Sequence, residues 1–308
     1  NTSYTITLAD FNNGNPTPNS NTLNLNKTQL QENPIAVVKT IEEGAHKIGY
    51  LLYNQFSSTF DAQLNTAFAT FQSENITDLI VDLRYNGGGK VSTATYLGGM
   101  ITGQFNGQLY SKELWNPKVQ EALDPSLFEN NFTNQLDNGT VNEPLNNLNL
   151  TSVYFITTQS TASASELVMN SLSAYIDVKS VGTTTIGKVH GSVTLYDSDS
   201  FTRTGDNLNA DHTWALQPLV LEIKNKNNFN EPDGIIPTIE LSEDFGNLGV
   251  LGEKSDPLLD RTIVLITTGN RPSDSNSTIN TINLEEIGNS QMNNPIKNNM
   301  FVDFKKNN

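Results

Sequence analysis

Residues 151–182, TSVYFITTQSTASASELVMNSLSAYIDVKSVG, decide the fold of this chain. The stretch opens on a short continuous apolar run at 151–158, which is typical of a strand buried on both faces. Apolar residues at helical spacing follow at 164–176, and DVKSVG after them predicts a second strand. A strand, a helix and a strand in this order indicate a βαβ unit, whose two strands run parallel.

The same alternation continues on both sides of this unit. The sequence predicts strands at 46–56 and 77–84 and a further strand within 212–225. It predicts helices at 60–75, 91–101 and 256–269, and an extended segment over DGIIPTIELS. This pattern predicts an α/β fold with a largely parallel sheet that is covered by helices. In such folds the working site lies beyond the carboxyl ends of the strands, and the loops 85–89 and 158–163 meet that description.

Composition divides the chain into three parts. Residues 1–35 are expected to form an N-terminal β segment with an Asn-, Pro- and Ser-rich turn or linker at 12–22. The core is expected over 36–269, with a polar insertion at 103–150 that we interpret as a long, partly irregular excursion. The Asn-rich residues 270–308 predict a peripheral or loosely held tail.

The overall composition excludes several classes of protein. The chain has 308 residues, a formal net charge of −15 and no cysteine. The negative charge disfavours nucleic acid and anionic membrane surfaces as partners. The absence of cysteine excludes disulfides, thiolate zinc sites and a cysteine nucleophile. No run of 18 apolar residues is present, so we expect no transmembrane segment in this chain. The opening NTSYT, without Met or a signal-peptide pattern, indicates a mature or trimmed fragment.

Two roles fit Ser163, which lies where the helix of the βαβ unit begins. Ser163 and Glu166 have the S-x-x-E spacing of a capping box, which favours a purely structural helix cap. A helix N-terminus also stabilises negative charge through its free N–H groups and its dipole, so a serine there can act as a nucleophile. Ala162 and Ala164 on either side leave room for a substrate backbone. The role of a nucleophile additionally requires a base near Ser163.

A serine nucleophile needs such a base. The chain has three histidines, His46, His190 and His212, but no G-x-S-x-G elbow. A Ser-His-Asp triad is therefore possible, but no sequence motif supports it. Lys188 is the stronger candidate, because a right-handed βαβ crossover brings its loop back toward Ser163. A lysine acts as a base only where burial lowers its pKa, and otherwise it is a solvated surface charge.

The stretch DLRYNGGG (82–89) follows another buried strand. Its glycines permit backbone conformations that other residues resist, and they leave N–H groups exposed. They form either a simple tight turn or one half of an oxyanion hole, with the N–H of Ala164 as the other half. We expect Asp82 and Arg84 to support this loop structurally. The phosphate-binding patterns G-x-G-x-x-G and G-x-x-x-x-G-K-[ST] are both absent.

DLRYNGGG, TASASE and IGK, in this order, resemble the S41 serine peptidases, which include the C-terminal processing peptidases and the tricorn core. The resemblance runs from about Ile35 to Leu265. It implies an α/β fold with a ClpP/crotonase-like β/α spiral core. The PDZ-like domain that is usual in the family is missing, and residues 1–35 resemble only its last strands. The resemblance implies an extracytoplasmic protein, either periplasmic or at the cell surface, including a lipid-anchored form whose N-terminus is missing here.

The same resemblance assigns roles to residues of this chain. It implies a Ser–Lys dyad that hydrolyses peptide bonds through an acyl-enzyme, with Ser163 as the nucleophile and Lys188 as the general base. It also implies an oxyanion hole formed by the backbone N–H groups of Gly88 and Ala164. We expect no metal and no cofactor for this chemistry.

The third member of the catalytic group stays open. Many processing peptidases carry a Gln four residues after the lysine, whereas this chain has Ser192 there, so Ser192 and Glu166 are the candidates for a supporting role. The expected partner is a peptide or protein substrate. An alternative is a catalytically silent member that binds a peptide or another ligand in the same groove. A crotonase-like acyl-CoA enzyme is disfavoured by the acidity of the chain.

Overall fold

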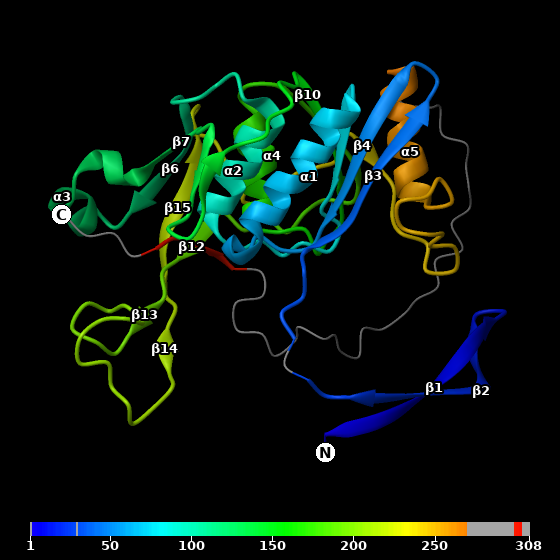
Figure 1. The fold of residues 1–308 in the computed structure, drawn as a ribbon, viewed down its shortest axis with the longest axis horizontal. Coiled ribbons are helices and arrows are strands. Elements are labelled where there is room, and N and C mark those ends of the chain that lie inside the picture. Colours follow the sequence, from blue (N-terminus) through cyan, green and yellow to red (C-terminus); the bar gives the residue numbers. More distant parts are fainter. Residues whose placement is uncertain (1, 29, 270–298, 304–308) are drawn as a thin grey trace.

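The computed structural model describes residues 2–28, 30–269 and 299–303, and its centre is a six-stranded sheet (Figure 1). In chain order the strands are β3 (Ile35–Glu43), β4 (His46–Tyr53), β5 (Asp78–Asp82), β10 (Ser152–Thr157), β11 (Asp177–Gly182) and β16 (Ile239–Glu240). Their order in space is β16–β11–β10–β5–β4–β3. All pairs are parallel except the β3–β4 hairpin at one edge. The α/β fold with a largely parallel sheet is therefore confirmed.

Four helices cover the two faces of this sheet: α1 (Asp61–Glu74), α2 (Val91–Thr102), α4 (Ala164–Ser173) and α5 (Pro257–Thr268). The first three lie on one face and α5 lies on the other (Figure 1). Alternate strand residues point to opposite faces, so Val81 packs toward α1, α2 and α4, whereas Ile80 packs toward α5. All four helices lie where the spacing of apolar residues predicts them.

A second sheet packs against the opposite side of the α2–α4 layer. Its five strands are β6 (Leu109–Trp115), β7 (Glu129–Asn131), β12 (His190–Ser192), β15 (Leu219–Asn225) and β17 (Met300–Phe301), in the order β17–β12–β15–β6–β7. Helix α4 contacts β11 of the first sheet and β15 of the second. The N-terminus of α4 therefore lies where both sheets can supply residues to one site.

The polar insertion 103–150 is more regular than its sequence indicates. Besides β6 and β7 it forms α3 (Pro117–Ala122), the 3₁₀ turn η2 (Pro125–Phe128) and a small hairpin of β8 (Gln135–Asp137) and β9 (Asn142–Pro144). Tyr110 and Phe132 are buried, and their rings meet edge to face with centroids 5.0 Å apart. A few aromatic anchors thus hold a segment whose composition is polar, and regular elements alternate with irregular stretches in it.

The N-terminal residues form a long hairpin that stands apart from the two sheets (Figure 1). It consists of β1 (Ser3–Asn12) and β2 (Asn15–Asn26), which are exposed along nearly their whole length. The prediction of a turn or linker at 12–22 was wrong, because β2 occupies most of that range. The turn is only Asn13 and Gly14, both with positive φ (48° and 84°), and an Asn-Gly pair is the usual two-residue connection of a hairpin.

Three further short elements complete the described chain: η1 (Ser58–Phe60), β13 (Leu195–Tyr196) and β14 (Ala215–Leu216). The last two pair at the base of an arm that projects from the second sheet (Figure 1). The predicted loose tail is wrong for residues 299–303, since Met300 and Val302 are buried, whereas residues 270–298 and 304–308 lie outside the described residues. Within the ranges that the structure describes, no helix has the length and apolar character that crossing a membrane requires.

Candidate active site

Ser163 lies between β10 and α4, at the carboxyl end of the parallel sheet. It is the residue before the first turn of α4, and its backbone has φ 65° and ψ −114°. Positive φ is uncommon for a non-glycine residue, and such strained positions cluster at functional turns. The turn from strand to helix presents the serine as a nucleophile elbow does, although the G-x-S-x-G pattern is absent.

The surroundings of the nearby hydroxyl groups distinguish Ser163 from its neighbours. Thr161 and Ser165 donate their hydroxyl protons to backbone carbonyls of the loop 83–86, at 2.8 and 2.9 Å. Ser160 is exposed to solvent. The Oγ atom of Ser163 is buried and has no hydrogen-bond partner within the described residues. A buried hydroxyl without a partner is costly in a fold, so its place calls for a functional explanation.

Glu166 ties the Ser163 turn to the loop that carries Lys188. Its carboxylate accepts the backbone N–H of Ser163 at 2.6 Å, which is one half of the predicted capping box. It also accepts the N–H groups of Gly187 and Lys188, at 2.5 and 2.9 Å, and the hydroxyl of Thr185 at 2.5 Å. These donors satisfy a carboxylate that is only 5% exposed. The Ser163 side chain faces the backbone of Glu166, as in the other half of the box, but its hydroxyl makes no hydrogen bond there.

Lys188 and Ser163 line the same cavity of about 20 Å³, which is space for a single water molecule. Burial lowers the pKa of Lys188, and the negative charge of Glu166 partly opposes this shift. A lowered pKa is the direction that a lysine base requires. The Lys188 Nζ atom donates to the side-chain oxygen of Asn299. Because Ser163 Oγ has no hydrogen bond, the Ser163–Lys188 hydrogen bond is not formed in this structure.

Gly88 packs directly against the Ser163 turn. Its φ is 110°, and a Cβ atom added there would lie 2.7 Å from the Cβ of Ser163 and 2.9 Å from the backbone nitrogen of Ala164. Only glycine fits such a position. The N–H of Gly88 donates to the side-chain oxygen of Asn86 at 2.9 Å. The N–H of Ala164, the first residue of α4, has no acceptor within its own helix.

Asn86 is a residue of this site that sequence reasoning missed. It is fully buried, and its Nδ2 atom donates to the carbonyl of Tyr53 at 2.9 Å. Its own carbonyl accepts the N–H of Ala162 at 3.1 Å and the hydroxyl of Ser165 at 2.9 Å. Asn86 therefore fastens the turn that contains Gly87–Gly89, the glycine turn, to the turn that carries Ser163. Its position before glycines gave no signal, because Asn precedes glycine in many ordinary turns.

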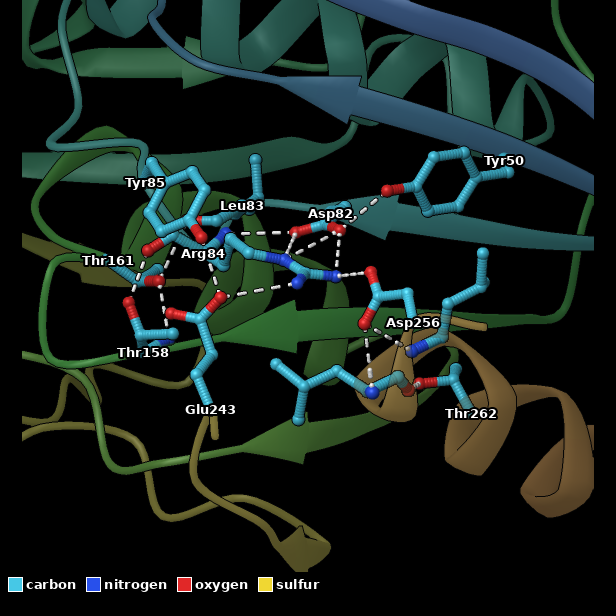
Figure 2. Close-up of polar contacts among 12 residues, drawn as sticks. Tyr50, Asp82, Leu83, Arg84, Tyr85, Thr158, Thr161, Glu243, Asp256 and Thr262 are labelled. Carbon is cyan, nitrogen blue, oxygen red and sulfur yellow. Dashed lines mark hydrogen bonds and ion pairs between the residues drawn. The ribbon is translucent and has the colours of Figure 1, made fainter. Parts of the chain in front are cut away.

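Figure 2 shows the buried ionic cluster on which the glycine turn rests. Arg84, at the start of the turn, forms ion pairs with Asp82 at 2.7 Å and with Asp256 at 2.6 Å. A longer pair of 3.3 Å joins Arg84 to Glu243, and the Tyr50 hydroxyl donates to Asp82 at 2.7 Å. Burial raises the pKa of Asp82, although the charge of Arg84 opposes the shift. The structural role predicted for Asp82 and Arg84 is confirmed.

The three histidines lie outside the cavity of Ser163. His46 pairs with Asp78 at 2.8 Å, at the amino end of β5 and so opposite the glycine turn. His212 pairs with Asp197 at 3.2 Å in the arm that contains β13 and β14. His190 opens β12 and lines a separate open groove on the second sheet. The arrangement therefore does not favour the Ser-His-Asp alternative.

Ser192, the candidate supporting residue, is fully buried in β12. Its hydroxyl donates to the carbonyl of Met300 at 3.1 Å. The resemblance made Ser192 a candidate for a supporting role, and the sequence had no signal that a C-terminal residue would pair with it. Asn299 and Met300 are thus further residues of the site that the sequence did not indicate.

Comparison with known proteins gives one family and a set of similar structures. A family model described as Peptidase family S41 matches residues 47–241. The chain is similar to a solved structure described as a candidate S41 protease from Bacteroides fragilis NCTC 9343, at 22% identity and a TM-score of 0.65. That likeness covers 83% of this chain but only 64% of the other, so this chain spans less than two thirds of that relative.

Two weaker likenesses accompany it. A photosystem II D1 C-terminal processing protease is 17% identical with a TM-score of 0.48, over 72% of this chain and 52% of that one. A lipoprotein from Streptococcus agalactiae is 15% identical with a TM-score of 0.45, over 66% and 65%. No curated protein sequence matches the chain. The Bacteroides fragilis structure shows a shared fold.

Proposed function

Because this chain belongs to peptidase family S41, we propose that it is a serine endopeptidase that cleaves peptide bonds through Ser163 and Lys188. The expected partner is a peptide or protein segment that enters in an extended conformation. Within this proposal, residues 36–269 form the catalytic core, and residues 1–35 are a separate N-terminal segment. The extracytoplasmic location implied by the sequence stays a prediction.

In the proposed reaction, neutral Lys188 accepts the proton of the Ser163 hydroxyl while Oγ attacks the carbonyl carbon of the scissile bond. The negative charge moves to the carbonyl oxygen, which the N–H groups of Gly88 and Ala164 stabilise. The intermediate collapses, Lys188 returns the proton to the leaving amine, and an acyl-enzyme remains on Ser163. A water molecule, deprotonated by Lys188, then releases the second product and restores the serine.

The proposed oxyanion hole requires one rearrangement. The N–H of Gly88 donates to Asn86 in the absence of substrate. It reaches an oxyanion only if the peptide unit turns away from the Asn86 side chain. The N–H of Ala164 needs no such change, since its position at the start of α4 already leaves it without an intrahelical acceptor.

One observation carries the proposal. Ser163 Oγ is buried without a hydrogen-bond partner in the described part of the chain, on a strained helix start, and it faces the same cavity as a lysine whose pKa burial lowers. A purely structural cap would hydrogen-bond through this hydroxyl, which Ser163 does not do, and a surface lysine would not lie in a cavity. The combination supports a nucleophile and its base.

Labelling with a fluorophosphonate probe tests the proposal directly. The wild-type chain is expected to be labelled on Ser163, and Ser163→Ala to lose both labelling and peptidase activity. Ser160→Ala, on the same turn but exposed, is the matched control and should be labelled as the wild type is. Circular dichroism must show the same folded signal for all three. Absence of labelling in the folded wild type would favour the alternative of a catalytically silent, peptide-binding member.

A further inference from the structure

The C-terminal residues 299–303 lie as an extended strand beside the candidate active site. In β17, Met300 and Phe301 pair in parallel with Gly191 and Ser192 of β12. The N–H of Phe301 donates to the carbonyl of Gly89 at 3.1 Å, on the other side of the strand. The segment therefore bridges the backbone of the glycine turn and the backbone that follows Lys188.

On the edge that faces away from residues 299–303, each of these two backbone segments already pairs with another part of the chain. Gly89 is paired with Phe56 on the side away from the C-terminal strand, through an isolated parallel bridge. Residues 190–192 pair with β15 on their far side. The remaining edges of these two backbones face each other, and residues 299–303 occupy them. A peptide that adds as a strand to either backbone has to use one of these edges. Strand addition to an exposed sheet edge is a common way for proteins to bind extended peptides.

The side chains of the segment reach the catalytic groups. Met300 is 1% exposed and lines the cavity that Ser163 and Lys188 share. The other apolar residues that line this cavity are Leu167, Val189 and Ile223. The side-chain oxygen of Asn299 accepts a hydrogen bond from Lys188 Nζ. The segment thus forms part of the wall of the cavity next to the proposed nucleophile and hydrogen-bonds to the proposed base.

We propose that residues 299–303 occupy the peptide-binding groove of this protein as a tethered strand, and that a substrate peptide must displace them. The groove is thereby assigned to extended peptides that place an unbranched apolar side chain where Met300 lies, at the edge of the cavity beside Ser163. This inference rests on the proposed peptidase function for the identity of the competing ligand. Because the segment is part of the same chain, its effective concentration is high, and peptides bind more weakly than they would to an empty groove.

A reversible cross-link tests the displacement. The Nζ atom of Lys90 and a carboxylate oxygen of Asp303 are 3.0 Å apart, and Asp303 is exposed. The chain has no cysteine, so Lys90→Cys with Asp303→Cys provides the only two thiols. A short bismaleimide with a cleavable disulfide spacer would hold the segment in the groove, and a reducing agent would free it. Asp303→Cys alone, treated with the same reagent, sets the baseline because it cannot form the link.

Two readouts follow the state of the groove. The first is the fluorescence anisotropy of a labelled peptide with the sequence KNNMFVD (297–303), measured in a Ser163→Ala background so that nothing is cleaved. The second is the rate of fluorophosphonate labelling with Ser163 intact. Linking is expected to weaken peptide binding at least about tenfold and to slow labelling similarly. The reason is that a cross-linked segment cannot leave the groove to make room for the peptide. Reduction should restore both.

A second variant acts in the opposite direction. Phe301→Pro removes the N–H that donates to Gly89, so the segment should leave the groove more readily. It is expected to tighten peptide binding and to speed labelling. Unchanged peptide binding after linking, or weaker peptide binding in Phe301→Pro at an unchanged folded signal, would show that residues 299–303 are a permanent structural strand and would overturn the proposal.

The outcomes also separate this inference from the proposed function. If the cross-link weakens peptide binding while no variant is ever labelled on Ser163, the proposal that residues 299–303 occupy a peptide-binding groove stands and the peptidase assignment fails. If Ser163 is labelled equally fast with the segment linked or free, and peptide binding is also unchanged, the peptidase assignment stands. In that case residues 299–303 do not occupy the peptide-binding groove.

Discussion

The backbone N–H groups of Ser163 and Lys188 donate to the same carboxylate oxygen, Oε2 of Glu166, at 2.6 and 2.9 Å. The proposed nucleophile and the proposed base are therefore held in register by their main chains, while their side chains face one cavity without a direct hydrogen bond. A buried carboxylate thus links the β10–α4 turn to the loop after β11, alongside the hydrogen bond from the Ile186 N–H to the Thr161 carbonyl at 3.1 Å.

Replacement of Lys188 tests the base. Lys188→Ala is expected to lower the rate of Ser163 labelling about 10²–10⁴-fold, the usual range for loss of a general base. Lys188→Arg should fail equally, because an arginine does not give up its proton. In the wild type, labelling should increase with pH as Lys188 loses its proton, and burial places this increase below the ordinary pKa of a lysine. A rate that is independent of pH across the neutral and alkaline range would contradict a lysine base.

Glu166→Gln tests the carboxylate as a positioning residue. The negative charge of Glu166 raises the pKa of Lys188 against the effect of burial, so its removal should lower that pKa further. The midpoint of the pH–rate profile is then expected to move to lower pH. The maximum rate should also fall, because an amide can accept only part of the hydrogen bonds that the carboxylate accepts. A purely structural role would lower the rate without moving the midpoint, and Glu166→Asp should keep the wild-type midpoint.

Gly88→Ala tests the close contact between the glycine turn and Ser163, the proposed nucleophile. The added Cβ would lie 2.7 Å from the Cβ of Ser163 at a φ of 110°, so the turn must shift away from the proposed oxyanion position. Labelling and hydrolysis are expected to fall about 10²–10³-fold, as for a lost oxyanion donor. Gly107→Ala is the matched control, because Gly107 also has positive φ but open space around it. Equal rates for the two variants would remove Gly88 from the site.

Arg84→Met tests the ionic cluster beneath the turn. The variant leaves Asp82 and Asp256 buried without their cation, so the free energy of unfolding should fall by about 3–5 kcal/mol in urea denaturation. Lys39→Met breaks an ion pair whose side chains are 39% and 55% exposed, and it should cost only about 0–1 kcal/mol.

The pH dependence of the Arg84→Met variant gives a second check. Burial raises the pKa of Asp82, and without Arg84 nothing of opposite charge in the cluster opposes the shift. A carboxyl whose pKa is higher in the folded than in the unfolded chain binds its proton more tightly when folded. The variant should therefore regain stability as the pH falls through the raised pKa of Asp82. A loss of stability that is the same at every pH would show that the carboxylates are not the cause.

Local features of this chain were predictable because they depend on neighbouring residues. The apolar runs at 77–84 and 151–158 and the helical spacing at 164–176 specify elements that the structure has in nearly the same places. The same local reasoning missed the strand β2, since the Asn-Gly turn that closes its hairpin lies inside a polar stretch that resembles a linker.

The sequence by itself determined that a serine stands at the start of a buried helix and that a glutamate follows it at capping distance. It left two roles open for that serine. Only the tertiary structure decided that Glu166 accepts a hydrogen bond from the Lys188 backbone. The same holds for the ion pair of Arg84 with Asp256, 172 residues later, and for the hydrogen bond from Lys188 to Asn299. Such contacts depend on the order of strands in the sheets and on where the chain returns, and no local pattern carries that information.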